Sequence, residues 1–425
     1  MRLKVIRTIA LASALAITAG LTGCSSGGDG AVQAELSKTE AEVFTWWADG
    51  SEKAGLDALV GVMAQQAPNV TFVNAAVAGG AGTNAREVLA ERLAIFDPPD
   101  SFQLHAGAEA ADYVKDGQLR DLTSLYEELG LQEAFPQSLL DSMKVNDKIY
   151  SIPANIHRAN VVWVNPEVLK AAGIDPKEKF KTTRDWIEAL RKIRKIGKTP
   201  LAIGQSWTQL QVFETTLLAD LGADKYSGLW NGKTSWTSAE VGSAIDNFRT
   251  LMSLTNENRN DLEWQQALGM VQDGSAGFNI MGDWAAAELE GQGVTLGTDI
   301  LYYPVPGTEG DFDFLADAFT LPVGAPNPDG AKAWLTAVAS PAGQIAFNKA
   351  KGSIPARTDV DTSTFSEYQQ GALKDFSENT IVASLAHGAA ASPTASGIIT
   401  TALGDFLASR IDQAEFQSTV AAAFK

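Results

Sequence analysis

The chain has 425 residues, a length that favours two or three domains of ordinary size over one. Its composition, with 45% hydrophobic and 20% charged residues, excludes disorder throughout, and its net charge of −18 argues against nucleic-acid binding, because a negative surface repels phosphate. One cysteine and three histidines leave no internal disulfide and no Cys- or His-rich metal site, so neither metal nor cofactor is expected, whereas ten tryptophans supply flat apolar surface.

The N-terminal segment has the pattern of a bacterial export signal. A basic start is followed by an apolar run over 8–19, which is too short for a stable transmembrane helix and fits a secretory signal peptide. The run leads into Leu21-Thr-Gly-Cys24, which resembles the lipobox of bacterial lipoproteins, in which the cysteine is lipidated and becomes the mature N-terminus. The alternative is a plain cleaved signal peptide (1–23) with an incidental cysteine.

The stretch from the cysteine to residue 40 is small and polar. It is expected to act as a flexible tether (24–40) with a reach of roughly 20–25 Å. Removal of 1–23 takes away three basic residues and no acidic one, which changes the net charge from −18 to −21. We therefore expect an extracytoplasmic protein, lipid-anchored to the bacterial cell membrane on its outer face or periplasmic side.

After the tether, short β-type runs alternate with amphipathic helical runs. Strands are predicted over 42–46 and 70–74, with a helix over 55–63 between them and another, capped by Asn84, after a Gly-rich loop. Asn165-Pro166 predicts a helix start that Gly173 ends, and Thr182 opens a helix that ends near Gly197. Strands separated by helices at this spacing predict an α/β fold of parallel units in two lobes, the later segments being richer in helix.

Two catalytic motifs are weak. Gly80-Ala-Gly82-Thr-Asn-Ala85 matches a dinucleotide-binding fingerprint, but a turn that needs glycine dihedral angles explains it more simply in an exported chain. Asp283, Glu288 and Asp317 could suggest a glycosidase, which needs two carboxyl groups at a set separation. No such separation can be read from sequence, and solvated surface acids are the default in so acidic a chain.

The tryptophans are a stronger indication of a ligand site than either of these motifs. Trp46 and Trp47 are adjacent at the end of a predicted strand, where successive side chains point to opposite faces, so one can pack in the core while the other enters a cleft. In open α/β sheets ligands bind beyond the carboxyl ends of the strands. A sugar has an apolar face that lies on an aromatic ring and hydroxyls that need Asp, Asn, Gln, His or Lys. The alternative, that both tryptophans are core residues, is about as probable on composition alone.

Several segments resemble the extracellular sugar-binding lipoproteins of ABC importers (solute-binding protein family 1). The resemblance runs through nearly all of the mature chain. It rests on Tyr113-Val-Lys-Asp-Gly-Gln-Leu-Arg-Asp-Leu-Thr123, Lys148-Ile-Tyr-Ser-Ile-Pro153, Val161-Val-Trp-Val-Asn-Pro166, Ala171-Ala-Gly-Ile-Asp-Pro176, Thr183-Arg-Asp-Trp186 and Asp273-Gly-Ser-Ala-Gly-Phe-Asn-Ile-Met-Gly-Asp-Trp284. Other pieces are similar to the glucose/galactose-binding branch: Phe44-Thr-Trp-Trp47, Asn74-Ala-Ala-Val-Ala-Gly-Gly-Ala-Gly82, Asp97-Pro-Pro-Asp-Ser-Phe-Gln-Leu-His-Ala-Gly107, Lys351-Gly-Ser-Ile-Pro-Ala-Arg357 and Ser384-Leu-Ala-His-Gly388.

The resemblance implies a type II periplasmic-binding-protein fold with discontinuous lobes and a hinge of several crossovers. The first lobe is expected to comprise 41–156 plus 313–357, and the second, helix-rich lobe 157–312 plus 358–425. The residues that the resemblance places in the substrate site are Trp46, Trp47, Glu52, Gln103, His105, Trp207, Asp283, Asp317, Lys351 and His387. His157 is interpreted as a structural residue near the hinge.

The function that the resemblance implies is substrate capture rather than catalysis. A monosaccharide (glucose, possibly galactose or mannose) would be bound between the lobes by a monomer and delivered to the membrane subunits of an ABC permease. Two alternatives stay open. One is an oligosaccharide receptor of the same fold, and the other is an extracellular glycoside hydrolase or a lectin-like accessory protein.

Overall fold

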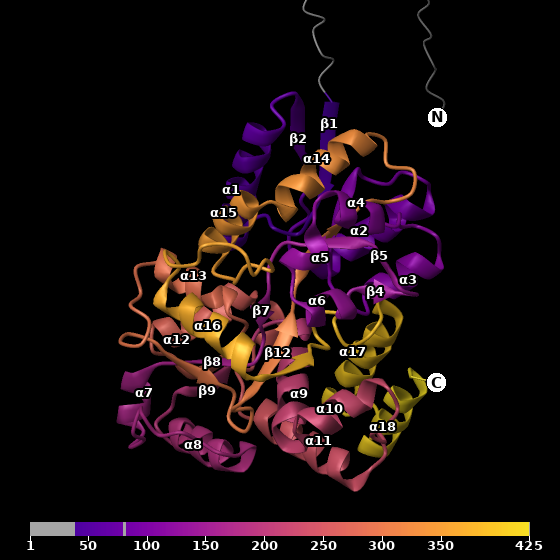
Figure 1. Cartoon of the computed structure of the whole chain (residues 1–425). Helices are drawn as coiled ribbons and strands as arrows, with labels where there is room; N and C mark the ends of the chain where they lie inside the picture. The colour runs from indigo at the N-terminus through magenta and orange to yellow at the C-terminus, as the bar shows by residue number, and fades with distance from the viewer. Residues whose placement is uncertain (1–38, 80–81, 425) are drawn as a thin grey trace, which may run out of the picture. The chain divides into compact units, whose positions relative to one another are not determined.

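The computed structural model describes residues 39–79 and 82–424 (Figure 1). The expected signal peptide, the lipidation site at Cys24 and nearly all of the expected tether lie outside the described residues. Among the helices that are described, none combines the length and the apolar character that crossing a lipid bilayer requires. Contacts join residues 38–425 into one compact unit.

A five-stranded sheet is built from segments that are far apart in the chain. Its order is β2-β1-β3-β13-β6, in which β1 pairs in parallel with β2 and β3, while β13 runs antiparallel to β3 and β6. The strands are β1 (Thr39–Phe44), β2 (Val70–Asn74), β3 (Ser101–His105), β6 (Ser151–Pro153) and β13 (Asp317–Thr320). Helices α1 (Gly50–Gln66), α14 (Pro328–Ala339) and α15 (Pro341–Lys351) pack against one another beside this sheet (Figure 1).

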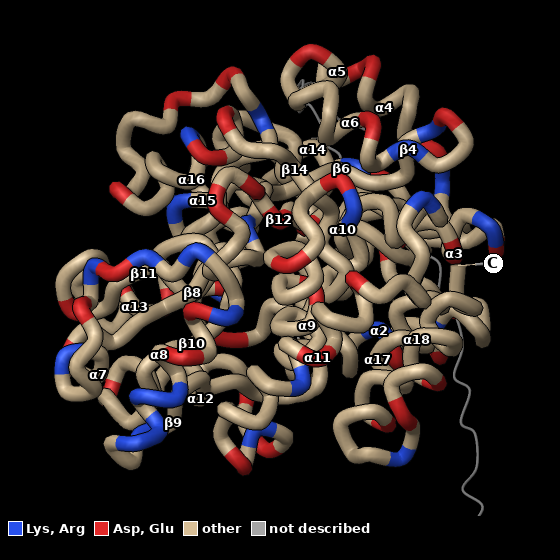
Figure 2. Tube along the Cα trace, turned by 90° about the horizontal axis from the view of Figure 1, so that it is seen from below, with Lys and Arg blue, Asp and Glu red and all other residues tan. Residues whose placement is uncertain are grey.

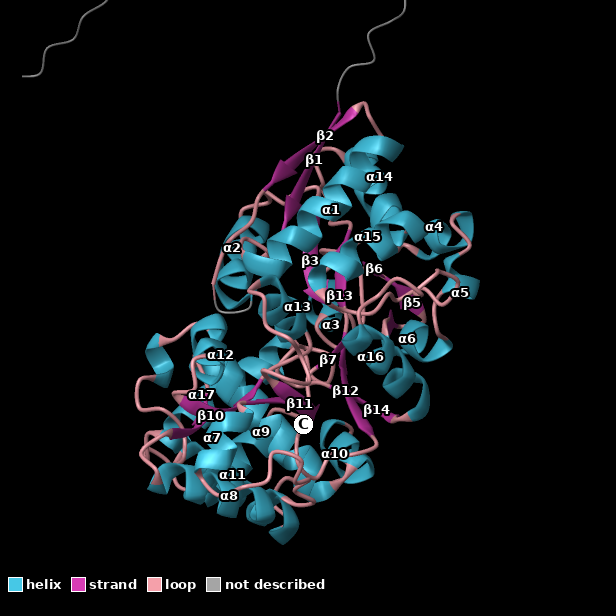
Figure 3. Cartoon of the chain, turned by 90° about the vertical axis from the view of Figure 1, so that its left-hand side faces the viewer, coloured by secondary structure: helices cyan, strands magenta, loops and turns pink. Residues whose placement is uncertain are grey.

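A four-stranded sheet carries the helix-rich middle of the chain. Its order is β11-β8-β10-β9, and only β9 and β10 are parallel, because β8 runs antiparallel to both of its neighbours. The strands are β8 (Val161–Val164), β9 (Thr199–Ala202), β10 (Ala276–Ile280) and β11 (Leu301–Pro304). Figure 3 shows helices on both sides of these strands. The helices are α7 (Pro166–Ala171), α8 (Thr183–Lys195), α9 (Ser206–Leu221), α10 (Ala223–Trp230), α11 (Ala239–Met252), α12 (Trp264–Gln272) and α13 (Trp284–Gly291).

A small three-stranded sheet lies where the chain passes from one large sheet to the other. Its order is β14-β12-β7, formed by β14 (Thr380–Ala383), β12 (Asp311–Leu315) and β7 (His157–Arg158). Strand β7 follows β6 of the first sheet and precedes β8 of the second, and β12 is followed by β13 of the first sheet. The chain therefore crosses between the two large sheets more than once, and the five-stranded sheet is discontinuous in sequence, whereas β8 to β11 of the four-stranded sheet follow one another along the chain.

The remaining elements are mostly short helices. Between β2 and β8 lie α2 (Thr83–Ala94), α3 (Ala110–Lys115), α4 (Thr123–Glu128), α5 (Leu131–Ala134), α6 (Gln137–Ser142) and the two-residue strands β4 (Lys144–Val145) and β5 (Lys148–Ile149). The C-terminal part adds α16 (Glu367–Glu378), α17 (Pro393–Leu407) and α18 (Gln413–Ala422).

Most predicted helix starts are confirmed by their hydrogen bonds. Asn165 caps α7 by accepting from two backbone N–H groups of the first turn, with Pro166 at the first helical position, and Thr182 caps α8 by accepting from the N–H of Asp185. The predicted cap at Asn84 is wrong. Helix α2 begins two residues earlier than a cap at Asn84 would imply, with Gly82 at the cap in a left-handed conformation (φ 91°), and Asn84 instead donates to the carbonyl of Ala78.

The prediction of parallel units is correct for only part of each large sheet. The parallel pairs join strands that an intervening helix connects, which is the case the sequence pattern describes. The antiparallel strands β13 and β8 enter their sheets directly from a crossover between the sheets. No local sequence pattern predicts the direction in which such a strand will run.

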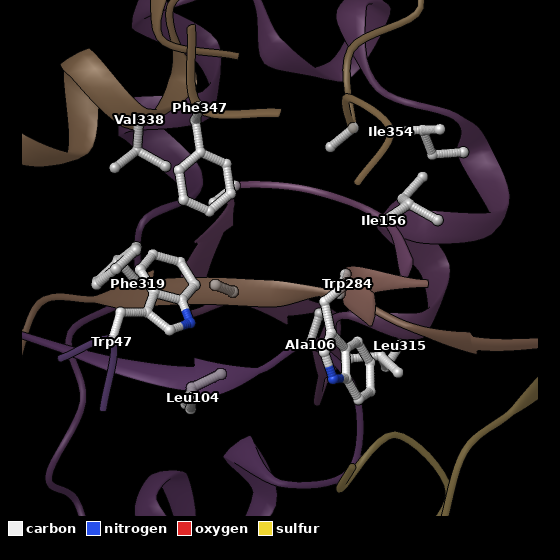
Figure 4. Close-up of a cluster of buried hydrophobic side chains, with 14 of the residues drawn as sticks. Trp47, Leu104, Ala106, Ile156, Trp284, Leu315, Phe319, Val338, Phe347 and Ile354 are labelled. Carbon is white, nitrogen blue, oxygen red and sulfur yellow. The ribbon is translucent and has the colours of Figure 1, made fainter. Parts of the chain in front are cut away.

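The core is apolar and the charges lie mostly outside it. Figure 2 shows acidic and basic positions interspersed along the trace, whereas Figure 4 shows Trp47 packed against Phe319 and Phe347 in the interior. The charged side chains that are nevertheless buried are Asp100, Glu109, Arg158, Glu214, Asp283, Asp313, Asp317 and Lys351. Because a buried charge is costly unless it is paired, these exceptions point to functional sites.

Candidate substrate-binding site

One cavity gathers side chains from the five-stranded sheet, the three-stranded sheet and the helices beside them. Its lining residues are Trp46, Glu52, His105, His157, Trp207, Trp264, Trp284, Leu315, Asp317, Lys351 and His387. Trp46 follows β1, and strands β3, β7, β12 and β13 carry His105, His157, Leu315 and Asp317. The other lining residues come from helices α1, α9, α12, α13 and α15 and from the loop after β14. Only about 20 Å³ of this cavity can hold the centre of a water-sized sphere, far less than the roughly 300–1,000 Å³ of small-ligand sites, so its walls lie close together in this structure.

Four of the ten tryptophans of the chain line this cavity. The Trp284 ring lies at its centre, 5.3 Å from the His387 ring and 5.2 Å from the His157 ring between centroids, with the Lys351 ammonium 5.7 Å from the Trp284 centroid. A Cβ atom at Gly282 would fall 2.0 Å from the Trp284 ring, so only glycine lets this tryptophan fold back over the turn.

All three histidines of the chain line the same cavity, and the Nδ1 atom of each forms a hydrogen bond with a neighbouring side chain. The partner of His105 is the Glu109 carboxylate at 2.7 Å, that of His157 is the Asp283 carboxylate, and that of His387 is the Ser384 hydroxyl at 2.8 Å. The Nε2 atoms of His157 and His387 are buried and have no hydrogen-bond partner among the described residues. Buried polar atoms are normally paired, so these nitrogens are prepared for a polar ligand.

Charged groups complete the polar lining. Lys351 is buried, and its ammonium lies 3.3 Å from the Glu52 carboxylate. Asp317 accepts hydrogen bonds from the Gln103 amide at 2.9 Å and from the Asn155 amide at 2.8 Å, which fix its carboxylate at the cavity wall. A hydrogen bond from a ligand hydroxyl to such an ionised group is roughly twice as strong as a neutral one.

Burial shifts the pKa values of several of these groups. Burial raises the pKa of Glu52, although the adjacent Lys351 cation works against it. Burial would also raise the pKa of Glu109, but the charge and hydrogen bond of His105 outweigh it, so that this pKa is lowered. Burial holds the pKa of His387 well below its usual value, so this ring is neutral near pH 7.

The structure brings together seven of the ten residues that the resemblance placed in the site: Trp46, Glu52, His105, Trp207, Asp317, Lys351 and His387. The other three predicted site residues do not line the cavity and are buried next to it. Trp47 is fully buried against Phe319 and Phe347, Gln103 bonds to Asp317, and Asp283 has no exposed surface and accepts from the ring of His157 and the N–H of Arg158.

Four lining residues escaped the sequence analysis: His157, Trp264, Trp284 and Leu315. The interpretation of His157 as structural was incomplete, because it lies on the small crossover sheet and its ring also faces the cavity. Trp284 directly follows Asp283, which the resemblance placed in the site. Nothing in the sequence distinguishes Trp264 from a core tryptophan.

The described residues contain no cluster of three or more His, Cys, Asp or Glu side chains arranged to hold a metal ion. What the lining offers is aromatic faces, fixed hydrogen-bonding groups and one Lys–Glu pair. These features suit the recognition of a small polar molecule that also has an apolar face.

Comparison with known proteins defines the class. Residues 47–345 match the model of the family described as bacterial extracellular solute-binding protein, and the chain belongs to this family. Its members bind solutes, and the chain is therefore not an enzyme, as predicted.

Particular relatives extend this result. The chain is 33% identical to an uncharacterized ABC transporter extracellular-binding protein of Pyrococcus horikoshii, over 91% of the chain and 88% of the relative. It is 31% identical to a probable sugar-binding periplasmic protein of Rhizobium meliloti, over 84% of the chain and 87% of the relative.

Solved structures confirm the two-lobed fold. The bacterial solute receptor AcbH, described as having an exclusive preference for β-D-galactopyranose, superposes with a TM-score of 0.76 at 17% identity, covering 91% of the chain and 100% of AcbH. A chitin oligosaccharide binding protein superposes with a TM-score of 0.78 at 18% identity, covering 91% and 98% of the two chains. At these identities the likeness concerns the fold alone.

Proposed function

We propose that the protein is the substrate-binding receptor of an ABC-type sugar importer and that it binds one monosaccharide, glucose or a close epimer, in the cavity described above. The observation that carries this proposal is the combination of four tryptophans with fixed polar groups in one small cavity. The relative from Rhizobium meliloti supports the sugar class.

The chemistry of a hexose suits this lining. The C–H face of a pyranose ring can lie on an aromatic ring such as Trp284 or Trp46, and its hydroxyls can both donate and accept hydrogen bonds. His157 and His387 offer unpaired nitrogens, Asp317 and Glu52 offer acceptors, and Lys351 offers a donor. Leaving one of these groups unpaired in a closed cavity would cost roughly 1–3 kcal/mol, so the site selects a ligand that satisfies them together.

The resemblance of segments such as Lys351-Gly-Ser-Ile-Pro-Ala-Arg357 and Ser384-Leu-Ala-His-Gly388 to the glucose/galactose-binding branch favours one sugar ring over several. An oligosaccharide receptor of the same fold is the second candidate, since a chitin oligosaccharide binding protein shares the fold. Residues Trp46, Glu52 and Trp264 also line a neighbouring depression, which an additional ring could enter. The similarity of the Trp46, His105, Lys351 and His387 segments to the glucose/galactose-binding branch is the reason for giving the monosaccharide precedence.

The remaining parts of the proposal concern assembly and location. We propose that the two lobes comprise 41–156 plus 313–357 and 157–312 plus 358–425, and that sugar shifts the population from open to closed because it contacts both. The monomeric receptor would be lipid-anchored at Cys24 to the cell membrane and would deliver sugar to the membrane permease.

Titration with sugars tests the function. Intrinsic tryptophan fluorescence and calorimetry with glucose, galactose, mannose and maltose should show a saturable response to at least one monosaccharide, because four tryptophans line the site. A response to maltose with only a weak response to glucose would establish the oligosaccharide receptor instead. If none of the monosaccharides binds, the proposal is wrong.

A further inference from the structure

Glu214 is a buried carboxylate that holds the loop carrying His387. It lies in the middle of α9 and has no exposed surface. Its carboxylate accepts hydrogen bonds from the hydroxyl of Ser384 at 3.0 Å and from the backbone N–H groups of Leu385 at 2.5 Å and Ala386 at 2.8 Å. Three donors from one short loop therefore converge on a single side chain of a different element.

The hydrogen bonds from Glu214 to His387 have a fixed direction. The hydroxyl of Ser384 has one proton, and an ionised Glu214 can only accept it. The Ser384 oxygen must then accept from Nδ1 of His387, which lies 2.8 Å away. A neutral imidazole has one N–H, so the proton on Nδ1 leaves Nε2 as a bare acceptor facing the cavity.

Asp313 explains how Glu214 can hold this position inside the protein. Asp313 is fully buried on β12, its carboxyl interacts with that of Glu214, and neither of its carboxyl oxygens has a donor among the described residues. Two carboxylates have nothing to donate to each other, so a pair this close needs at least one proton between them. Burial raises the pKa of both acids, that of Glu214 to about 7.

No cation of the surroundings contacts the two carboxyl groups in a way that could replace this proton. Arg158 on β7 is the nearest cation, but its N–H groups are used by Asn160, Asp375 and the carbonyl of Asp311. The other titratable groups facing the pair are Tyr226 of α10, the Asp311 carboxyl and the neutral ring of His387, and none of these is a cation at neutral pH.

We propose that Glu214 is a positioning residue of the sugar cavity: through Ser384 it fixes the tautomer of His387, so that Nε2 accepts a hydrogen bond from a sugar hydroxyl, and a proton held with Asp313 stabilises it there. The inference rests on the proposed function only in assigning a sugar to the cavity. The tautomer itself is a property of the receptor without ligand.

Nitrogen-15 NMR of the full chain, labelled in histidine and studied without sugar at pH 7.5, tests the proposal directly. The chain has only three histidines, and a His387→Gln variant assigns the signals. We expect His387 to have a protonated Nδ1 and an unprotonated Nε2. A proton on Nε2 instead would overturn the proposal.

The variant Glu214→Gln has nearly the same shape and should reverse the chain of hydrogen bonds. Its carbonyl can keep the N–H groups of Leu385 and Ala386, while its amide donates to Ser384, whose hydroxyl must then donate to Nδ1. We expect the His387 proton to move to Nε2 and the affinity for D-glucose, measured by calorimetry, to fall by about tenfold. An unchanged tautomer in this variant would overturn the proposal.

Ser384→Ala provides a second variant and Ser396→Ala its matched control, because the Ser396 hydroxyl is also buried but has no partner among the described residues. We expect Ser384→Ala to lose the preference for Nδ1–H and Ser396→Ala to keep both the tautomer and the affinity. Equal effects of the two variants would contradict the proposal. If the unmodified chain fails to bind glucose, the proposed function fails, while the NMR result still decides the role of Glu214.

Discussion

At the scale of single residues, Asp283 shows how a group can act on a ligand that it does not touch. It has no exposed surface, and its two oxygens accept from the His157 ring and from the N–H of Arg158. The carboxylate therefore orients His157, whose Nε2 lies in the cavity 3.6 Å from Asp317. Such a carboxylate also decides which imidazole nitrogen carries the proton.

We predict that Asp283→Ala weakens sugar binding by at least tenfold, because His157 loses the partner that orients it and a buried ring nitrogen loses its hydrogen bond. Calorimetry with the best-binding sugar measures the effect. Asp100→Ala is the matched control: Asp100 is equally buried and also accepts backbone N–H groups, from Glu42 and Asn327, but lies outside the cavity lining. Unchanged affinity in Asp283→Ala would show that His157 does not need this orientation.

The difference between residues that line the cavity, such as His157, and residues that support them, such as Asp283, shows how much of the site could be predicted from the sequence. The types of residue and most of their positions followed from the resemblance, because Trp46, His105, Lys351 and His387 occur in recognisable segments. The division of these residues into those that line the cavity and those that support the lining could not be predicted from the sequence. Whether a side chain lines the cavity or supports a neighbour, as Gln103 supports Asp317, depends on side-chain directions that only the assembled sheets define.

At the scale of elements, the end of β1 gives two adjacent tryptophans different environments. Trp46 lies in the cavity, 5.1 Å from the His105 ring between centroids, while Trp47 packs 4.8 Å from the Phe347 ring in the core (Figure 4). Alternation of side chains along an extended segment predicts this division without saying which tryptophan takes which side. The tight packing of α1 against α15, which carries Phe347, settles the choice.

We predict opposite effects of two matched substitutions. Trp47→Ala should cost about 3–5 kcal/mol of the free energy of unfolding, as for a large core side chain, and leave sugar affinity within about threefold. Trp46→Ala should weaken sugar binding by at least tenfold and cost less stability. Urea unfolding and calorimetry measure the two quantities. The assignment of the two tryptophans would be refuted if Trp47→Ala reduced the affinity more than Trp46→Ala did.

Helix starts followed from local chemistry at Asn165 and Thr182, but not at Asn84, where Gly82 takes the cap position instead. Strand direction did not, since β8 and β13 are antiparallel to neighbours that come from distant parts of the chain. A pairing of this kind is decided by which segment reaches the sheet edge after a crossover. No periodicity within the strand records that choice.

At the scale of the whole molecule, the Glu214–Asp313 pair links folding to pH. In the unfolded chain both acids have ordinary pKa values near 4, whereas burial in the folded protein raises that of Glu214 to about 7. The folded state therefore binds more protons than the unfolded state between these limits. Stability is fully present below the unfolded pKa, falls as the pH rises from about 4.5 to 7, and is flat above that as far as this group is concerned.

We predict that the raised pKa of Glu214 alone costs on the order of 3 kcal/mol of unfolding free energy across that interval, from about 1.4 kcal/mol per pKa unit, and that Asp313, whose pKa burial also raises, adds to the slope. In Asp313→Asn one of the two buried carboxyl groups with a raised pKa is gone, so the dependence of the unfolding free energy on pH should become weaker and leave the part that Glu214 contributes. Urea unfolding at pH 5, 6, 7 and 8 measures the slope in both proteins. Asp311→Asn, two residues away on the same strand with a more open carboxyl, should retain most of the slope. A slope that persists undiminished in Asp313→Asn would mean that other buried acids control the pH dependence and that this pair holds no extra proton.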